Sequence, residues 1–247
     1  GLMFHNCDLA VAEDTEFSNS PVVAGELHTQ AAGDILFYGS SLLPRAVRNR
    51  CRSGQAYGVM VMKEFNTDTV TRPLVALNQI TGCIGYGIAL YNTGLLGDPW
   101  RTLLLGNDIE NITGSQRDGS DMNKYWGAGI YVVGAEQTVI DGGSITDVGQ
   151  QTNNDQLAPG AIGVTQATIV SIDNVDIDTS GYYGITLRDP SGVGIAGGWA
   201  TIGSNVKIRG TTKAAVHILE RGYVRSRAIV ENSGAQGLLI ANTTVAK

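Results

Sequence analysis

A short phrase recurs along the chain, in which a small residue, usually glycine, precedes an aliphatic residue and opens a short alternating strand. Gly181–Asp189 (GYYGITLRD) contains one copy. Other copies begin at Gly1, Gly58, Gly87, Gly129, Gly163, Ala215 and Gly237. Most are preceded by a second short strand with Asn or Asp near its start. A repeat of this kind constrains the fold more than any single residue does.

The spacing of the small residues indicates the architecture. It is 21 residues from Gly163 to Gly184 and reaches 42 from Gly87 to Gly129. One rung of three short strands and three turns needs about 20 residues, and its turns can lengthen without disturbing the stack. The helix or Leu-Asn ladder of a leucine-rich repeat is missing, and a propeller blade needs about 40 residues. We therefore predict an all-β fold, a right-handed single-stranded parallel β-helix (a solenoid) with irregular corner loops.

Composition agrees with one long stack of rungs. The 33 glycines fit a chain with many tight turns, and only 16% of residues are charged, against about a quarter in average proteins. We predict a single β-helix domain over residues 1–247. The sequence opens within a rung and shows no capping helix, and a bare terminal rung exposes a sheet edge. We therefore expect a section of a longer protein, or a subunit whose neighbours cover its ends.

Several partners are unexpected for this chain. Its net charge is −6 with no run of Lys and Arg, which argues against nucleic acid. No apolar stretch has the length of a transmembrane helix, so we expect no membrane insertion. Cys7, Cys51 and Cys83 fit no zinc spacing, and we interpret them as small buried side chains rather than functional thiols. We expect no metal and no cofactor.

Two polar insertions, at residues 113–126 and 149–160, interrupt consecutive rungs. If both leave the stack at one corner, they form a wall beside a face of the solenoid, where function tends to lie. Their candidate acids and aromatic residues are Asp118, Asp121, Tyr125, Trp126 and Asp155.

The basic cluster of the chain lies within Leu42–Arg52 and contains Arg45, Arg48, Arg50 and Arg52. It could form a short helix, a rim loop or an outward strand. A solvated face is the ordinary interpretation, and a binding site for an acidic sugar is the sharper alternative.

Aligning the copies on their small residues predicts a polar outer face. Alternate residues of a strand point to opposite sides, and like positions of successive rungs stack. The outward positions bring together Tyr131, Thr165, Thr186, Arg188, Asp189, His217 and Glu220. Aromatic rings stack on sugars, and carboxylates and guanidinium groups bind their polar groups. The plainer alternatives are that Asp189 forms a turn before Pro190, that Arg188 pairs with Glu220 or Asp189, and that His217 is a solvated or stacked residue.

The glycine-aliphatic opener, the Asn/Asp-x-Ile second strand and the irregular corner loops resemble the pectate-lyase-like β-helix superfamily. Within that group the chain is most similar to a section of a bacteriophage tailspike. The resemblance implies a homotrimer, a location outside the cell or on the virion, and a bacterial polysaccharide as partner. It transfers no catalytic motif. The Asp-Pro-His of the epimerases is approached only by Asp98-Pro99-Trp100.

We therefore expect a tailspike-like β-helix that recognises and depolymerises a bacterial surface polysaccharide. One alternative is a non-catalytic structural or glycan-binding β-helix of a virion or cell-surface fibre, and another is a secreted polysaccharide lyase. A hydrolase needs two facing carboxylates, whereas a lyase needs a base and a neutralising cation, and the sequence leaves both open. The catalytic candidates are Asp118, Asp121, Asp155, Asp189, Glu220 and His217. The substrate-binding candidates are Tyr91, Trp100, Tyr125, Trp126, Tyr131 and Arg188.

Overall fold

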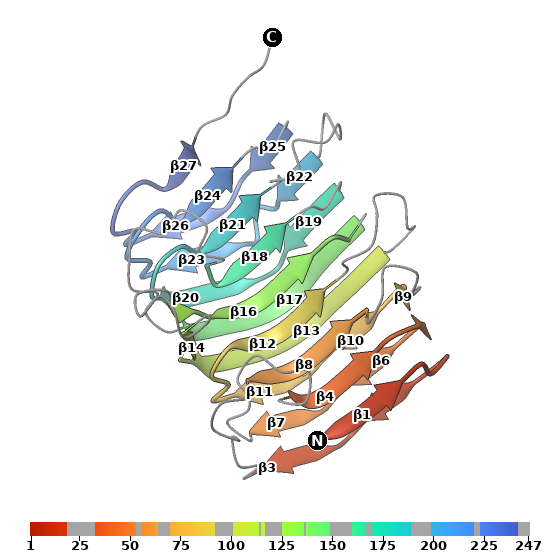
Figure 1. Cartoon of the computed structure of the whole chain (residues 1–247). Coiled ribbons are helices and arrows are strands. Elements are labelled where there is room, and N and C mark those ends of the chain that lie inside the picture. The colour runs from red at the N-terminus through yellow and green to blue at the C-terminus, as the bar shows by residue number, and fades with distance from the viewer. Residues whose placement is uncertain are drawn as a thin grey trace.

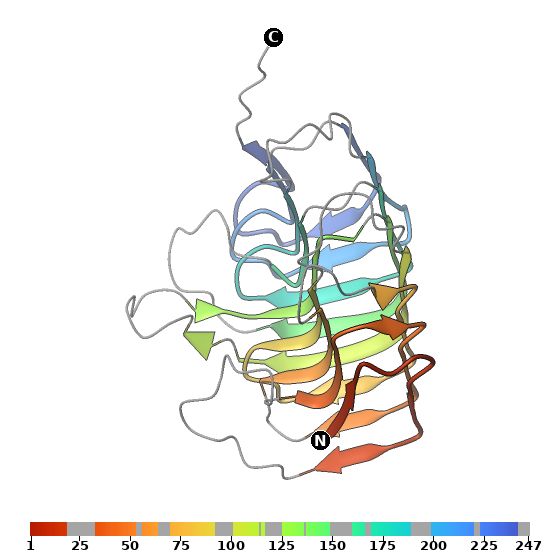
Figure 2. The same ribbon diagram turned by 45° about the vertical axis from the view of Figure 1, so that its right-hand side comes forward.

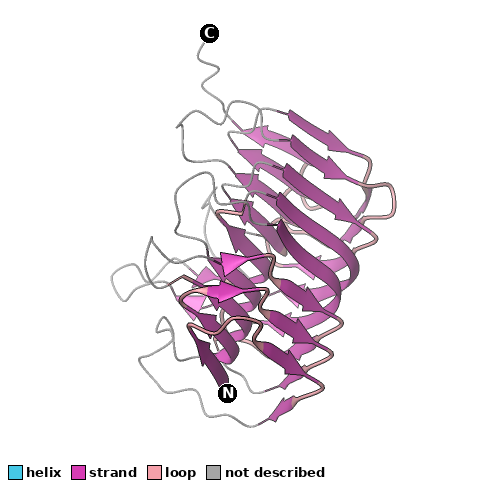
Figure 3. Cartoon of the chain, turned by 90° about the vertical axis from the view of Figure 1, so that its right-hand side faces the viewer, coloured by secondary structure: helices cyan, strands magenta, loops and turns pink. Residues whose placement is uncertain are grey.

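The structure is a computed structural model of the chain. It describes residues 1–18, 33–52, 56–63, 70–91, 101–113, 115–116, 125–135, 137–148, 160–165, 169–188, 199–219 and 223–241. Strands connected by turns make up these ranges, which contain no helix (Figure 3).

The first large sheet, called sheet A, has nine parallel strands. In order of pairing they are β1 (Leu2–His5), β4 (Gly33–Tyr38), β8 (Tyr57–Met62), β12 (Tyr86–Tyr91), β16 (Ala128–Val133), β18 (Ile162–Thr165), β21 (Ile185–Arg188), β24 (Val216–Leu219) and β27 (Leu238–Ala241). The order of pairing is also the order along the chain.

The second large sheet has 14 strands and divides into two rows, B1 and B2. Row B1 contains β2 (Val11–Glu13), β6 (Arg45–Val47), β10 (Leu74–Ala76), the first halves of β13 (Arg101–Ile112) and β17 (Gln137–Val148), β19 (Ile169–Asp173), β22 (Trp199–Ile202) and β25 (Tyr223–Ser226). Row B2 contains β3 (Glu16–Ser18), β7 (Arg50–Arg52), β11 (Gln79–Thr81), the second halves of β13 and β17, β20 (Asp176–Ser180), β23 (Lys207–Arg209) and β26 (Ile229–Glu231).

Two small pairs complete the described strands. In one, β5 (Ser41–Leu42) is parallel to β9 (Val70–Thr71). In the other, β14 (Ser115–Gln116) is antiparallel to β15 (Tyr125–Trp126).

The chain passes through sheet A, row B1 and row B2 in turn, and each strand pairs with its counterpart in the next circuit. One such circuit is called a rung below. Figures 1 and 2 show the rungs stacked from β1 at one end to β27 at the other. This arrangement is consistent with the predicted parallel β-helix.

The core consists of the inward side chain of each strand. Ile88 from sheet A, Leu104 from row B1 and Ile109 from row B2 are each at most 1% exposed and belong to one apolar cluster. Equivalent aliphatic residues repeat in the neighbouring rungs, so the interior is a continuous aliphatic stack. Burial of apolar surface of this kind is the main favourable contribution to folding.

The recurring glycines mark where sheet A comes closest to row B2. A Cβ added at Gly87 would lie 2.6 Å from Ile109 Cγ2 and 2.7 Å from Gly129 O. At Gly129 it would lie 2.5 Å from Ile145 Cγ2. Only a very small residue permits this approach, which explains why the phrase begins with Gly or Ala.

The register corrects one position of the sequence alignment. Ile162 pairs with Ile130 and with Ile185, so the small residue of the sixth rung is Ala161 and not Gly163. Thr165 consequently aligns with Arg188, and Gly163 aligns with Thr186. The sequence misled because Gly163 also precedes a valine, although the methyl group of Ala161 fits the same site.

The corner between rows B1 and B2 is held by a ladder of three buried asparagines. Asn49 Nδ2 donates to Asn78 Oδ1 at 3.0 Å, and Asn78 Nδ2 donates to Asn107 Oδ1 at 2.9 Å. The residue before each asparagine has a positive φ, which bends the chain. The ladder ends at Gly143, where a Cβ would lie 2.1 Å from Asn107 O. This tight corner sets the angle at which row B2 faces solvent.

Candidate functional site

The two long insertions leave the stack at the same corner. Residues 113–124 follow β13, residues 149–159 follow β17, and in both rungs the next strand of a large sheet belongs to sheet A. The two insertions therefore share a corner, which was the condition for the predicted wall beside one face of the stack. The row B2 halves of β13 and β17 lead directly into them, which directs attention to the outer face of row B2.

The outward side chains of row B2 form two polar columns. Strand register gives the first as Arg50, Gln79, Asp108, Ser144 and Asp176. The second contains Arg52, Thr81, Glu110, Thr146 and Asp178. The residues between the columns, such as Ile80 and Ile109, are buried in the core.

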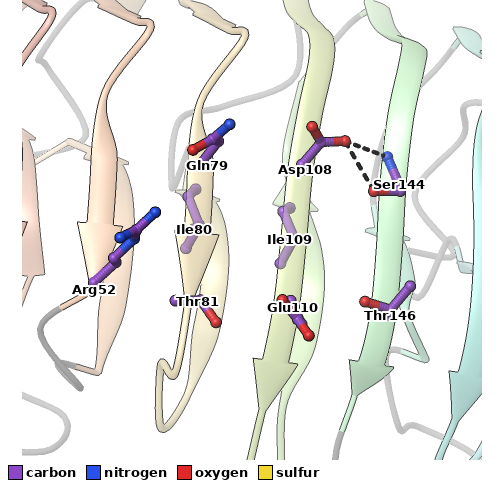
Figure 4. A pocket seen from close by; sticks show the side chains of 9 residues that line it. All are labelled: Arg52, Gln79, Ile80, Thr81, Asp108, Ile109, Glu110, Ser144 and Thr146. Atoms are coloured by element: carbon purple, nitrogen blue, oxygen red, sulfur yellow. Dashed lines mark hydrogen bonds between the residues drawn. The ribbon is translucent and has the colours of Figure 1, made fainter.

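A hollow of about 330 Å³ lies on this face (Figure 4). It is lined by Arg52, Gln79, Ile80, Thr81, Asp108, Ile109, Glu110, Ser144 and Thr146. A second hollow of about 340 Å³, lined by Asp14, Arg48, Asn49, Arg50, Leu77 and Gln79, adjoins it at Gln79. The two hollows together extend across several rungs, along the axis of the stack.

The two carboxylates of the first hollow differ in their surroundings. Asp108 Oδ1 accepts hydrogen bonds from Ser144 Oγ at 2.8 Å and from Ser144 N at 3.1 Å, which orients this carboxylate (Figure 4). The side chain of Glu110 is exposed, and its carboxylate makes no hydrogen bond or ion pair with a described residue. One acid is therefore fixed and the other is available to a ligand.

Cations lie at the other end of the hollows. Arg52 Nη1 is 4.0 Å from Glu16 Oε1, a weak contact, and exposed Arg50 makes no ion pair with a described residue. Arg48 differs, because it donates to both oxygens of Asp14 at 2.9 Å and also to Glu13. Its hydrogen bonds to Asp14 raise the pKa of Arg48 and lower that of Asp14. Arg50 and Arg52 are therefore the cations that can meet a ligand.

Three further charged residues of row B2 pair with one another. Arg209 Nη2 lies 2.9 Å from Asp176 Oδ1, and Arg209 Nε lies 3.5 Å from Asp178 Oδ2. The basic cluster of the sequence forms outward positions on β6 and β7 and the turn between them, which is one of the three predicted alternatives.

Two of the predicted sugar-binding aromatic residues lie together on the outside of sheet A. Tyr91 and Tyr131 make an edge-to-face contact with centroids 5.7 Å apart. Tyr131 also stacks on Tyr86 at 5.2 Å, and Tyr86 stacks on Tyr57 at 5.8 Å. Burial is the main cause that raises the pKa of the Tyr91 hydroxyl. These rings pack chiefly against one another.

His217 is fully buried and stacks on Tyr183, with centroids 4.2 Å apart. Burial lowers its pKa to about 4, and neither ring nitrogen has a hydrogen-bond partner among the described residues. The structure therefore shows the stacked alternative for this residue. Arg188 is half-buried on the same side of sheet A.

The other predicted site residues are not placed. Trp100, Asp118, Asp121, Asp155, Asp189 and Glu220 lie outside the described residues. Tyr125 and Trp126 form β15, within the insertion that follows β13. Sequence reasoning missed Asp108, Glu110 and Ser144. Their signal was the Asp-x-Glu alternation directly after Asn107, in the strand that leads into the first insertion.

Over the described residues, no three His, Cys, Asp or Glu side chains group so that they could hold a metal ion. The three cysteines are free, and burial raises the pKa of Cys51 and of Cys83. No helix in the described part of the chain could span a membrane. Comparison with family models, with curated proteins and with solved structures finds no match.

Proposed function

We propose that this chain is a glycan-recognising β-helix that binds a bacterial surface polysaccharide along the outer face of row B2. The single observation that carries the proposal is the pair of adjoining hollows, lined by guanidinium, amide, hydroxyl and carboxylate groups. These groups match the hydrogen-bonding surface of a sugar chain. The length of the hollows across several rungs suits a polymer better than a small ligand.

The proposed fold in full is a right-handed, single-stranded parallel β-helix. Successive parallel strands in each sheet are joined by crossovers that run through the other rows. Crossovers between parallel strands of one sheet are right-handed in nearly all proteins. The tailspike-like resemblance, a homotrimeric assembly and a location on a virion or outside the cell belong to the same proposal.

Charge favours a sugar that carries acidic groups. Arg50 and Arg52 stand in the two outward columns of β7, and neither is neutralised as Arg48 is by Asp14 and Glu13. Guanidinium groups bind carboxylates in a two-pronged geometry. We therefore place acidic units of the polysaccharide near β7 and neutral units near Thr81, Ser144 and Thr146.

Hydrolysis is the second candidate, because Asp108 and Glu110 are alternate residues of β13. Such positions are about 6.7 Å apart along a strand, and inverting glycosidases separate their two carboxylates by about 6.5–9.5 Å. Glu110 would be the acid or base that contacts the sugar, and Ser144 would hold Asp108 in place. A lyase and a purely structural fibre remain the competing functions.

The test is binding of the folded chain to a panel of bacterial capsular and O-antigen polysaccharides, measured by calorimetry. We expect Arg50→Gln and Glu110→Gln each to weaken binding about ten- to a hundredfold, the effect of losing one charged hydrogen bond. Arg225→Gln on β25 and Glu231→Gln on β26 are matched controls, because both residues are exposed and lie outside the hollows.

Activity is read in the same samples from released reducing ends and from the ultraviolet absorbance of unsaturated products. Reducing ends without absorbance indicate a hydrolase, and absorbance indicates a lyase. Binding that is equal in all four variants would reject the row B2 site. No binding by a folded sample across a broad panel would favour the structural fibre.

A further inference from the structure

His217 occupies an unusual position on the second-to-last strand of sheet A. Its neighbours Val216 and Ile218 point into the core, so its own side chain leaves the interior of the solenoid. The residue is nevertheless 0% exposed. Within the described part of the chain, neither Nδ1 nor Nε2 has a hydrogen-bond partner. An unpaired buried polar group is costly and calls for an explanation.

The environment of His217 is poor in acceptors for a proton. Thr186 is its register partner on β21, and the Thr186 hydroxyl is also buried, with no hydrogen bond to a described residue. Tyr183 covers the imidazole with its ring. From β27, Leu239 is the register partner on the other side and adds an apolar side chain.

The described charged residues that flank His217 along β21 and β24 are Arg188 and Lys213. Arg188 extends from β21, two residues beyond Thr186. Lys213 precedes β24, and its Nζ lies 5.6 Å from the ring centroid of Tyr182. The acids Asp189 and Glu220 follow β21 and β24 in sequence and lie outside the described residues. Burial, and not a neighbouring charge, is therefore what disfavours a proton on the imidazole.

We propose that His217 is an acid-sensitive latch, which keeps the last rungs closed while it is uncharged and opens them when it takes up a proton. The latch lies near the C-terminal end of the described stack, because β24 pairs with β27, which is the last strand of sheet A. Terminal units of a solenoid contact a neighbour on one side only and open at lower cost than the whole stack. Protonation is therefore expected to release β24 and β27 before the middle rungs.

The direction of the effect follows from burial. Burial lowers the pKa of His217 to about 4, whereas the opened state has the ordinary value of about 6.5. The opened state therefore binds a proton that the closed state does not between these two values. The opening equilibrium should rise about tenfold per pH unit as pH falls from 6.5 to 4, or about 300-fold in total.

The test uses the intact chain in two measurements. NMR of ¹³C-labelled histidine rings follows the three histidines from pH 7.5 to 3.5. We expect one ring to stay neutral below pH 5, or to lose its signal as the last rungs open. Hydrogen exchange then compares the wild type with His217→Phe, which retains a ring over Tyr183 but cannot titrate. Taking the difference at each pH cancels the intrinsic pH dependence of exchange.

We expect β24 and β27 to exchange up to about 300-fold faster in wild type than in His217→Phe as pH falls, and β12 and β16 to show no difference. His217→Gln provides a second variant if the phenylalanine does not fit. The proposal would be overturned if all three histidines of the wild type titrated near the ordinary pKa of about 6.5. So would a difference between wild type and variants that does not change with pH.

Discussion

The outer faces of sheet A and row B2 have the same geometry and opposite character. Both consist of alternate residues of stacked parallel strands. On sheet A, Met60, Tyr86 and Ala89 form a buried apolar cluster outside the core. On row B2, Asp108 and Glu110 stand in solvent around a hollow. A position on the outer face of a sheet is therefore not the same as a position in water, and the candidate site lies on the exposed face.

The largest effect should come from removing an aromatic ring from the outside of sheet A. Tyr86 is stacked between Tyr57 and Tyr131 and is 8% exposed. We expect Tyr86→Ala to lower the free energy of unfolding by about 3–5 kcal/mol, the usual loss for a buried aromatic residue. The measurement is urea unfolding followed by circular dichroism.

Gln79→Ala on row B2 is the matched control, because Gln79 is exposed and takes no part in the asparagine ladder. We expect a change within about 0.5 kcal/mol. Equal losses in the two variants would contradict the contrast between the faces.

The second-largest effect should come from the buried asparagine ladder at the corner between rows B1 and B2. Asn78 accepts hydrogen bonds from Asn49 N and Nδ2 and donates to Ala46 O and Asn107 Oδ1. Asn78→Ala leaves several of these buried groups unpaired, at a cost on the order of 3 kcal/mol. Exposed Asn205→Ala serves as the control and should change little in the same urea experiment.

Much of the fold was predictable from the sequence, because in most rungs the close approach of sheet A to row B2 leaves room for only Gly or Ala at one position. The start of a rung could therefore be recognised in the sequence at Gly58, Gly87, Gly129 and Gly184. The place of Asp34 in the rung could not be predicted from the sequence. It fills the same column in the second rung, opposite Gly58, where Cys51 takes the place that Ile80 has in the next rung.

The site was less predictable for a physical reason. Alternation along a strand assigns a side chain to one surface of its sheet, and it carries no information about what covers that surface. His217 and Tyr131 were correctly placed outside the interior, yet His217 is buried and Tyr131 packs on other tyrosines. Asp108 and Glu110 needed the register of β13 with β11 and β17 before they could be seen to share a hollow.

A smaller effect, of the opposite sign, is expected at Thr186 on sheet A. Its hydroxyl is buried and has no hydrogen bond to a described residue, so replacing it with a methyl group removes a desolvation cost. We expect Thr186→Val to raise the free energy of unfolding by about 1 kcal/mol. Thr146→Val on row B2 should bring no such gain, because Thr146 is only half-buried. A loss of stability in Thr186→Val would show that the hydroxyl has a partner in solution.

The smallest effect should come from a surface pair at the N-terminal end of row B2. Exposed Arg48 donates to Asp14, which lowers the pKa of that carboxyl group. Stabilisation from this pair is present above the ordinary pKa of an Asp and is lost as pH falls through the lowered value. Arg48→Gln should therefore return the pKa of Asp14 toward its ordinary range. NMR of the carboxyl carbon of Asp14 measures this change. The free energy of unfolding at neutral pH should change less in Arg48→Gln than in the other variants, because water screens exposed ion pairs.

Arg45→Gln is the control, since exposed Arg45 makes no ion pair with a described residue. If Arg48→Gln destabilised the chain as much as Asn78→Ala does, the surface of row B2 would contribute to the fold in the way that the outside of sheet A does, and the contrast between the two faces would be wrong.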